Sequence, residues 1–264
     1  MTDPKLRDIL AAAAFAALVC VAGRADAAQC GNTAAGFEAW KSQFSEEARG
    51  RASAASLSAL IGTAYSTQTI SADRGQRSFK LSLDQFLAKR GATTIVSRGR
   101  GLKRQNAALF ASIEQRYGVP PGPLLAIWGM ETGFGAVRGN VNTLSAVATL
   151  AYDCRRSAYF TDQLYAALTL VDRGLLTAST RGAAHGEVGH TQFLPKNVLT
   201  YGTGDLNNVG AALTSTANFL KGHGWQAGAG YQPGEANFAA LQGWNAASVY
   251  QRAIALMGRQ IDGE

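Results

Sequence analysis

The segment 121–135 constrains the fold of this chain most, because it predicts a helix with an acid on its apolar face. Two prolines, at 121 and 123, suit the first turn of this helix, where a missing N–H costs nothing. Four residues then recur at helical spacing and share one face: Leu124, Ile127, Trp128 and Glu131. The glycines at 133 and 135 end the helix and leave room beside the acid.

This position predicts a raised pKa for the Glu131 carboxyl, because apolar surroundings disfavour its charged form. A carboxylic acid that stays protonated is what a general acid for a glycosidic oxygen needs. An arbitrary Glu, however, more often lies on a solvated face or pairs with an arginine. The sequence motif around Glu131 must therefore decide whether this residue is a general acid or an ordinary solvated or paired Glu.

The composition fits a globular protein with a sizeable core. Of the 264 residues, 47% are hydrophobic and only 16% are charged, so there is ample apolar material to bury. Apolar residues follow helical spacing along most of the chain, and no stretch shows convincing strand alternation. We therefore predict an all-α, mainly helical protein with little or no β structure, at most a minor hairpin. Length and the absence of a linker-like stretch favour one domain over residues 28–264.

Helical structure is predicted over several segments, with a glycine-rich loop at 182–192 between two of them. The helical segments are 36–88, 106–117, 121–132, 143–152, 159–173, 209–222 and 246–261.

Residues 1–27 have the pattern of a secretory signal peptide. Lys5 and Arg7 precede an apolar run, and Ala25-Asp26-Ala27 offers a small-x-small cleavage site. The run is short for a spanning helix, although a retained membrane anchor stays open as an alternative. We therefore expect a periplasmic protein that is cleaved near Ala27.

The formal net charge of +7 also bears on the expected partners. A basic exported protein is attracted to anionic surfaces, and nucleic acid is not an expected partner outside the cytoplasm. Cell-wall glycan with acidic stem peptides is a better candidate, although the charge could equally serve solubility alone.

Removal of the signal segment leaves two cysteines, Cys30 and Cys154. An even pair in an oxidising compartment favours one disulfide, although two unrelated buried thiols would fit the same sequence. The three histidines form no cluster with metal-ligand spacing, so we expect no metal site and no cofactor.

A series of short motifs occurs in a fixed order between residues 73 and 225. They are Asp73-Arg74-Gly75-Gln76-Arg77, Tyr117-Gly118-Val119-Pro120, the Glu131 run 127–135, and the segments 144–150, 155–160, 189–195 and 215–225. In this order they resemble the lytic murein transglycosylases of the membrane-bound B type. The pairing of Glu-Thr-x-Phe-Gly with Gly-x-Thr-Gln-Phe-Leu-Pro is the most specific part of the likeness. The resemblance implies a lysozyme-like α-helical fold.

The resemblance also implies cleavage of the β-1,4 bond between N-acetylmuramic acid and N-acetylglucosamine in peptidoglycan. Glu131 would protonate the leaving oxygen and then act as base on the muramic acid 6-hydroxyl, which attacks C1 to give a 1,6-anhydro sugar. The expected partner of this monomer is the glycan strand, with a cell-wall or secretion-machinery protein left open. A muramidase that hydrolyses the same bond and a non-catalytic wall-binding protein remain as alternatives.

Four further residues take substrate-binding roles by their position in the family motifs. Gln192 should reach the substrate or the acid with its amide, unless it caps a helix. Tyr159 should line the sugar cleft, unless it packs in the core. Near the C-terminus, Asn245 should hold the substrate, unless it is the N-cap of the last helix, and Tyr250 matches a second cleft tyrosine.

Other acidic and basic residues near these motifs have simpler interpretations. Glu187 is the only other acid in a loop expected to face the cleft. It could orient the substrate, but a structural hydrogen bond to the backbone is favoured. Arg155 and Arg156 could pair with Asp153 or meet acidic stem peptides, and a structural ion pair is favoured.

The chain departs from the family pattern in several places. Ala183 stands where some members carry a serine that supports the acid, and Trp244 replaces the usual tyrosine. Segment 201–208 keeps only Asp205 with adjacent amides, which is too few ligands for calcium. The segment 226–243 lacks room for the β-rich subdomain of many relatives, which predicts a more open cleft.

Overall fold

The computed structural model describes residues 28–75 and 81–263, so the predicted signal peptide lies outside the described residues. The helices are α1 (Phe37–Glu47), α2 (Ala54–Ile61), α3 (Thr67–Arg74), α4 (Leu83–Arg90), α5 (Ala92–Gln105), α6 (Ala107–Tyr117), α7 (Pro121–Thr132), α8 (Thr143–Tyr152), α9 (Ser157–Asp172), α10 (Pro195–Tyr201), α11 (Val209–Gly222), α12 (Phe238–Trp244) and α13 (Ser248–Asp262), preceded by a 3₁₀ turn (Ala34–Gly36). In the described part of the chain, no helix is long and apolar enough to cross a bilayer.

The β structure is minimal, as predicted. Strands β1 (Val141–Asn142) and β2 (Arg181–Gly182) pair antiparallel. They do not form a hairpin, because α8 and α9 lie between them in the chain. The prediction of an all-α protein is confirmed.

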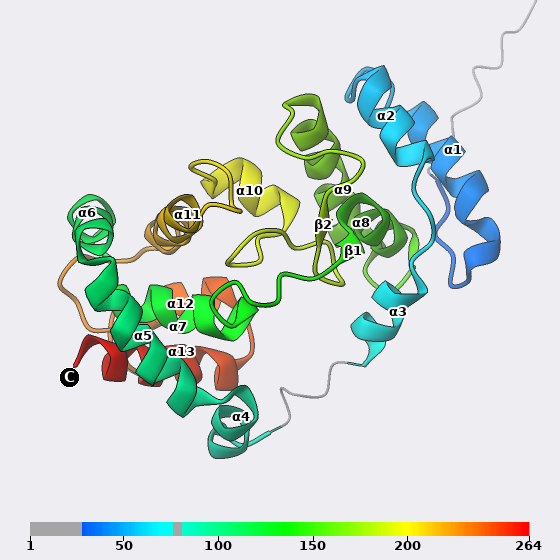
Figure 1. The fold of residues 1–264 in the computed structure, drawn as a ribbon. Helices are drawn as coiled ribbons and strands as arrows, with labels where there is room; N and C mark the ends of the chain where they lie inside the picture. The colour runs from blue at the N-terminus through cyan, green and yellow to red at the C-terminus, as the bar shows by residue number, and fades with distance from the viewer. Residues whose placement is uncertain (1–27, 76–80, 264) are drawn as a thin grey trace, which may run out of the picture.

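The helices gather into two groups (Figure 1). Helices α1, α2 and α3 lie with α8, α9 and the two strands, whereas α4 to α7 lie with α12 and α13. Helix α10 packs against both α9 and α11, and α11 contacts α6, α7 and α12. This chain of contacts joins the two groups, so residues from both can contribute to one site.

Helix α7 is buried on all sides rather than on one face. Every residue from 121 to 130 is buried, so burial includes the predicted face of Leu124, Ile127 and Trp128 and extends to the other faces of the helix. Two glycines explain the close packing. A Cβ at Gly122 would lie 2.3 Å from the carbonyl oxygen of Gly258 in α13, and one at Gly129 would lie 2.5 Å from Ile95 in α5. Neighbouring helices therefore approach the backbone of α7 directly.

Local sequence signals explain which boundaries were predictable. Helices α8 and α11 have the predicted bounds, and each begins after an asparagine whose side chain accepts a backbone N–H, Asn142 and Asn208. Helix α5 was not predicted, because Gly99 and Gly101 and a run of basic residues interrupt its apolar pattern. Helices α10 and α12 have seven residues each, too few for a periodic pattern to stand out.

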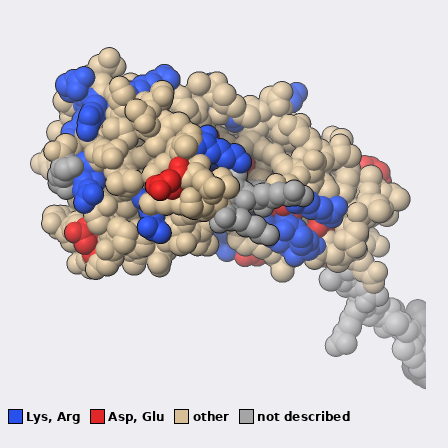
Figure 2. Space-filling model, turned by 90° about the horizontal axis from the view of Figure 1, so that it is seen from below, with Lys and Arg blue, Asp and Glu red and all other residues tan. Residues whose placement is uncertain are grey.

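One face of the molecule is predominantly basic or uncharged. Figure 2 shows one face of the molecule, on which the groups of Lys and Arg are larger than those of Asp and Glu. This agrees with the net charge of +7.

The structure joins Cys30 and Cys154 in a disulfide, as the cysteine count favoured. Their Cα atoms lie 5.0 Å apart across a sequence separation of 124 residues. Next to the disulfide, the Gly31 N–H donates to the Tyr152 carbonyl at 2.9 Å. The start of the described chain is thus attached to the connection between α8 and α9.

We expect the mature protein to contain no free thiol, and reduction to lower its stability. In the chain-entropy model a crosslink over so long a loop contributes up to about 4–5 kcal/mol, although measured values are often smaller. Thiol titration of the denatured, unreduced protein checks the pairing, and melting curves of Cys30→Ser and Cys154→Ser check the energy. Two titratable thiols per chain would contradict the disulfide.

Candidate active site

Glu131 lies in the last turn of α7, directly before a tight change of chain direction. Gly133 caps the helix in the left-handed conformation, with φ 57°. Phe134 also has a positive φ of 60°, which is uncommon for a residue with a side chain. Its ring is buried and packs edge-on against Trp128, with the ring centroids 5.3 Å apart. Burial of this ring offsets the backbone strain at the end of the helix.

One oxygen of the Glu131 carboxyl is held by two donors. The Tyr250 hydroxyl donates to Oε1 at 2.7 Å, and the Trp244 indole Nε1 donates to the same oxygen at 3.0 Å. Among the described residues, Oε2 has no hydrogen-bond partner. An indole N–H can only donate, so Oε1 must act as acceptor. The proton of the neutral acid is therefore placed on Oε2.

Opposing effects set the pKa of Glu131, and the result is a pKa above its usual value. Burial of the carboxyl raises the pKa most, and the negative charge of Glu187 raises it further. The hydrogen bonds from Tyr250 and Trp244 lower the pKa, as does the positive charge of Arg90 in α4. The acid is thus biased towards its protonated form, as the sequence predicted.

Tyr250 and Trp244 reach the acid from the C-terminal helices. Tyr250 is buried in α13, and burial beside Glu131 raises the pKa of its hydroxyl well above the usual value. It therefore stays a neutral donor. The sequence placed Tyr250 in the cleft but predicted contact with substrate rather than with the acid. Trp244 was noted only as a departure from the family, and no local signal marks it as a partner of Glu131.

A second loop, residues 189–192, is attached to the end of α7. The Thr132 hydroxyl donates to the His190 carbonyl at 2.7 Å, and the Trp128 indole donates to His190 Nδ1 at 3.1 Å. Gln192 has a positive φ of 58°, and its amide donates to the Gly189 carbonyl at 2.7 Å. The N-cap of α10 is Leu194, so the helix-capping alternative for Gln192 is wrong. Gln192 closes its own loop and makes no hydrogen bond to Glu131 among the described residues.

Tyr159 lies on the surface rather than in the core. It is 51% exposed and packs edge-on against Phe160, so the core-packing alternative is wrong. It lines a pocket of ≈ 590 Å³, together with Arg155 and Arg156. An exposed ring beside basic groups can present its face to a sugar.

Asn245 and Glu187 both make local hydrogen bonds to the backbone. Asn245 Oδ1 accepts from the Ala247 N–H at 2.9 Å and shapes the turn between α12 and α13. The N-cap of α13 is Ala247, so the alternative in which Asn245 is the N-cap is wrong. Glu187 Oε2 accepts from the His185 N–H at 3.0 Å, which is the backbone hydrogen bond that was favoured.

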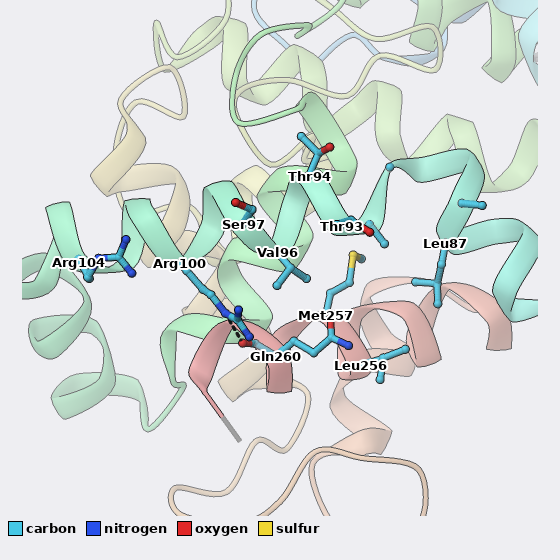
Figure 3. Close-up of a pocket in the computed structure, with 13 residues that line it drawn as sticks. Leu87, Thr93, Thr94, Val96, Ser97, Arg100, Arg104, Leu256, Met257 and Gln260 are labelled. Carbon is cyan, nitrogen blue, oxygen red and sulfur yellow. Dashed lines mark hydrogen bonds between the residues drawn. The ribbon is translucent and has the colours of Figure 1, made fainter.

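One groove lies away from these residues. It has a volume of ≈ 760 Å³ and runs between α5 and α13 (Figure 3). Apolar side chains such as Val96 and Met257 lie beside Arg100 and Arg104 there. None of the predicted site residues lines it, so it is not the place where Glu131 would act.

The comparison with protein families decides the classification of the chain. The family model described as transglycosylase SLT domain matches residues 36–235, which include Glu131, Tyr159, Glu187 and Gln192. The chain belongs to the transglycosylase SLT domain family. The match ends before Trp244 and Tyr250, and a single domain over 28–264 stays a prediction.

Similar proteins and structures agree with this family. Over 123 residues the chain is 36% identical to membrane-bound lytic murein transglycosylase B from Escherichia coli strain K12, covering 43% of this chain and 34% of that relative. The chain thus spans about a third of this curated relative's length. SltB3 from Pseudomonas aeruginosa, in complex with NAG-NAM-pentapeptide, matches with a TM-score of 0.79 and 27% identity, over 86% of this chain and 80% of SltB3. The resemblance to the B type and the lysozyme-like fold are confirmed.

A second similar structure was solved with calcium. Escherichia coli lytic transglycosylase Slt35 in complex with calcium matches with a TM-score of 0.66 and 20% identity, over 89% of this chain and 96% of that one. In this transglycosylase-domain chain, Asp205 Oδ1 accepts from both the backbone N–H and the side-chain amide of Asn207. No group of three His, Cys, Asp or Glu suitable for a metal occurs in ranges 28–75 and 81–263. Asp205 is thus used as a turn acceptor.

We expect calcium to leave the melting temperature unchanged. A ligand at a hundredfold its dissociation constant stabilises by roughly 2.7 kcal/mol, which shifts the midpoint of a domain of this size by several degrees. Thermal unfolding with excess calcium and with chelator provides the measurement. A calcium-dependent rise of several degrees would reveal a site that the sequence did not predict.

We also expect Tyr250→Phe and Trp244→Phe to raise the pKa of Glu131. Each removes a donor that stabilises the carboxylate, and a hydrogen bond to a charged group corresponds to about one pH unit or slightly more. Carboxyl ¹³C NMR titration measures the change, with Glu131→Gln to assign the signal. Tyr201→Phe is the matched control, because Tyr201 packs against Phe219 and has no contact with the acid. A fall in the Glu131 pKa in either variant would show that the hydrogen bonds are misassigned.

Proposed function

We propose that this chain is a peptidoglycan lytic transglycosylase that cleaves the MurNAc-β-1,4-GlcNAc bond and forms 1,6-anhydromuramic acid. One observation carries the proposal. Glu131 is biased towards its protonated form, with Oε1 held by Tyr250 and Trp244 and Oε2 left to donate. This is the arrangement that a general acid requires, because the proton lies on the oxygen that Tyr250 and Trp244 do not contact.

The reaction then follows from a single carboxyl group. Glu131 Oε2 gives its proton to the glycosidic oxygen as the bond to C1 breaks. The carboxylate that results is stabilised by the donors Tyr250 and Trp244. It takes the proton of the muramic acid 6-hydroxyl while that oxygen bonds to C1, which restores neutral Glu131. The nucleophile is part of the substrate, so its effective concentration is high and no placed water is needed.

Several features support glycan strands as the substrate. SltB3 from Pseudomonas aeruginosa binds a NAG-NAM-pentapeptide, and this chain shares its fold over most of its length. The exposed ring of Tyr159 is suited to stack on a sugar, with Arg155 and Arg156 beside it for acidic groups. Gln192, Asn245 and Glu187 are proposed to bind the sugar chain from the neighbouring turns.

The place of action follows from the same proposal. Peptidoglycan lies outside the cytoplasmic membrane, which agrees with a signal peptide cleaved near Ala27 and with a disulfide between Cys30 and Cys154. We propose that the mature protein works as a periplasmic monomer.

We expect Glu131→Gln to abolish release of 1,6-anhydromuropeptides from purified sacculi. General acid–base catalysis contributes about 10²–10⁴-fold, and the amide cannot donate the proton. Mass spectrometry of the soluble products supplies the assay. Glu114→Gln is the control, because Glu114 is an exposed acid on α6 and should keep full activity.

The products also separate the alternatives. Release of reducing-end muropeptides alone by the wild type would make the protein a muramidase. Tight binding of sacculi without release of products would favour the non-catalytic binding protein. Near wild-type release by Glu131→Gln would exclude Glu131 as the acid.

The same variant is expected to be at least as stable as the wild type at neutral pH. The pKa of Glu131 is raised in the native state, so native Glu131 binds its proton more tightly than unfolded Glu131. Native stability is therefore lost as pH rises from the usual value of 4.5 through the native pKa. Gln removes this loss, so the gain in melting temperature should be present at pH 7 and absent below pH 4.5. A destabilised Glu131→Gln at pH 7 would contradict this account.

A further inference from the structure

We propose that Arg90 is a positioning residue that fixes Glu131 from two directions, through the last turn of α7 and through the ring of Tyr250. The proposal deepens the proposed function, because it rests on Glu131 as the acid. Arg90 acts on the groups that hold Glu131 rather than on the sugar itself.

Arg90 lies where α4 meets the two helices that build the site. It is the last residue of α4, and Gly91 ends that helix in the left-handed conformation, with φ 67°. Gly91 is also the N-cap of α5, which packs against both α7 and α13. Helix α4 itself packs against α13. The half-buried side chain of Arg90 is thereby held beside both α7 and α13.

The first contact of Arg90 is with the backbone of the helix that carries the acid. Its Nη1 donates to the Met130 carbonyl at 3.5 Å, which is a long hydrogen bond. Met130 directly precedes Glu131, and its carbonyl is one of the last four of α7, which have no partner further along the helix. A cation at this end also compensates the partial negative charge of the helix dipole. Arg90 therefore stabilises the turn from which Glu131 projects.

The second contact is with the side chain that donates to the acid. The guanidinium carbon of Arg90 lies 5.7 Å from the ring centroid of Tyr250 and 5.2 Å from that of Phe86, within the range of a cation–π interaction. Phe86 is fully buried and packs edge-on against Tyr250, with the ring centroids 5.8 Å apart. Two residues of α4 thus hold the ring whose hydroxyl donates to Glu131 Oε1 at 2.7 Å.

The charge of Arg90 acts in the same direction along both routes. Burial raises the pKa of Glu131 and of Tyr250, and the positive charge of Arg90 lowers both. Among the other groups that act on the acid, the indole of Trp244 lowers its pKa and the carboxylate of Glu187 raises it. A more acidic Tyr250 hydroxyl is also a stronger donor. Arg90 therefore favours the carboxylate that exists between the two proton transfers of the reaction.

Arg98 of α5 provides a matched control at the same end of α7. Its Nη1 donates to the Gly133 carbonyl at 3.4 Å, and its guanidinium carbon lies 5.1 Å from the ring centroid of Phe134. Among the described residues, no contact joins Arg98 to Tyr250 or Glu131. Loss of Arg98 thus removes a charge and a carbonyl contact from the end of the helix, whereas loss of Arg90 also releases the Tyr250 ring.

The test measures the Glu131 titration directly, so that it does not depend on activity. In Arg90→Met, carboxyl ¹³C NMR should show the pKa of Glu131 raised by about 0.5–1 pH unit, because a nearby positive charge is lost and the Tyr250 ring is released. Arg90→Lys keeps the charge and should give a smaller rise. Arg98→Met should raise the pKa less than half as much, even where both variants lower the melting temperature.

Three results of this titration would overturn the proposal. They are an unchanged Glu131 pKa in Arg90→Met, an equal rise in Arg98→Met, and a rise in Arg90→Lys as large as that in Arg90→Met. Should Arg90→Met fail to fold, Arg90→Gln removes the same charge and is judged by the same shift.

A double-mutant cycle tests the route through Tyr250. Arg90→Met should raise the pKa of Glu131 less in a Tyr250→Phe background than in the wild type, because the hydroxyl that Arg90 positions is already absent. Fully additive shifts would overturn this route.

The kinetic readout should follow the titration. Arg90 does not bind the sugar, so Arg90→Met should lower kcat about three- to tenfold and leave KM nearly unchanged. The alkaline limb of kcat/KM reports loss of the protonated acid, so it should move to higher pH by the same amount as the pKa of Glu131. A rise in KM with unchanged kcat would place Arg90 in the sugar site and overturn the proposal. A wild type without any activity refutes the proposed function, but the NMR titration still decides the role of Arg90.

Discussion

The burial of α7 is the constraint on which the rest of the structure depends. Helices α13 and α5 approach its backbone so closely that Gly122 and Gly129 have no room for a side chain. A helix enclosed in this way cannot shift without opening the core. Its last turn therefore has a fixed position, and Glu131 takes that position from the helix. The close packing around α7 therefore fixes the position of Glu131.

Because α13 both encloses α7 and carries Tyr250, packing and chemistry are coupled. The helix that buries the acid also supplies a donor to its Oε1, and α12 supplies the second donor through Trp244. Burial raises the pKa of Glu131 and these donors lower it. Burial alone would leave the carboxylate too unstable to form after proton transfer. Donors alone would leave the proton too weakly held before the transfer. Glu131 therefore needs both burial and hydrogen-bond donors in order to act first as acid and then as base.

How much of this was predictable depends on how local each signal is. Glu131 and the glycine that ends its helix are neighbours in sequence, and Asn142 and Asn208 mark helix starts within one turn. The contacts from Trp244 and Tyr250 to Glu131 span more than a hundred residues, and an indole next to a carboxylate leaves no periodic pattern. The all-round burial of α7 was missed for the same reason, since helical periodicity describes one helix and not its neighbours. The pairing of Arg155 and Arg156 with Asp73 rather than Asp153 is likewise a matter of tertiary placement.

The proposed site takes residues from both groups of helices. Glu131, Trp244 and Tyr250 come from one group, whereas Tyr159 begins α9 in the other and Glu187 follows β2. A sugar chain that contacts both groups of helices requires their relative position to be fixed to within the length of a hydrogen bond. Burying Asp73 is costly unless its charge is compensated, and the guanidinium groups of Arg155 and Arg156 provide that compensation. These ion pairs therefore contribute definition of position rather than net stability, because they fix α3 against the start of α9.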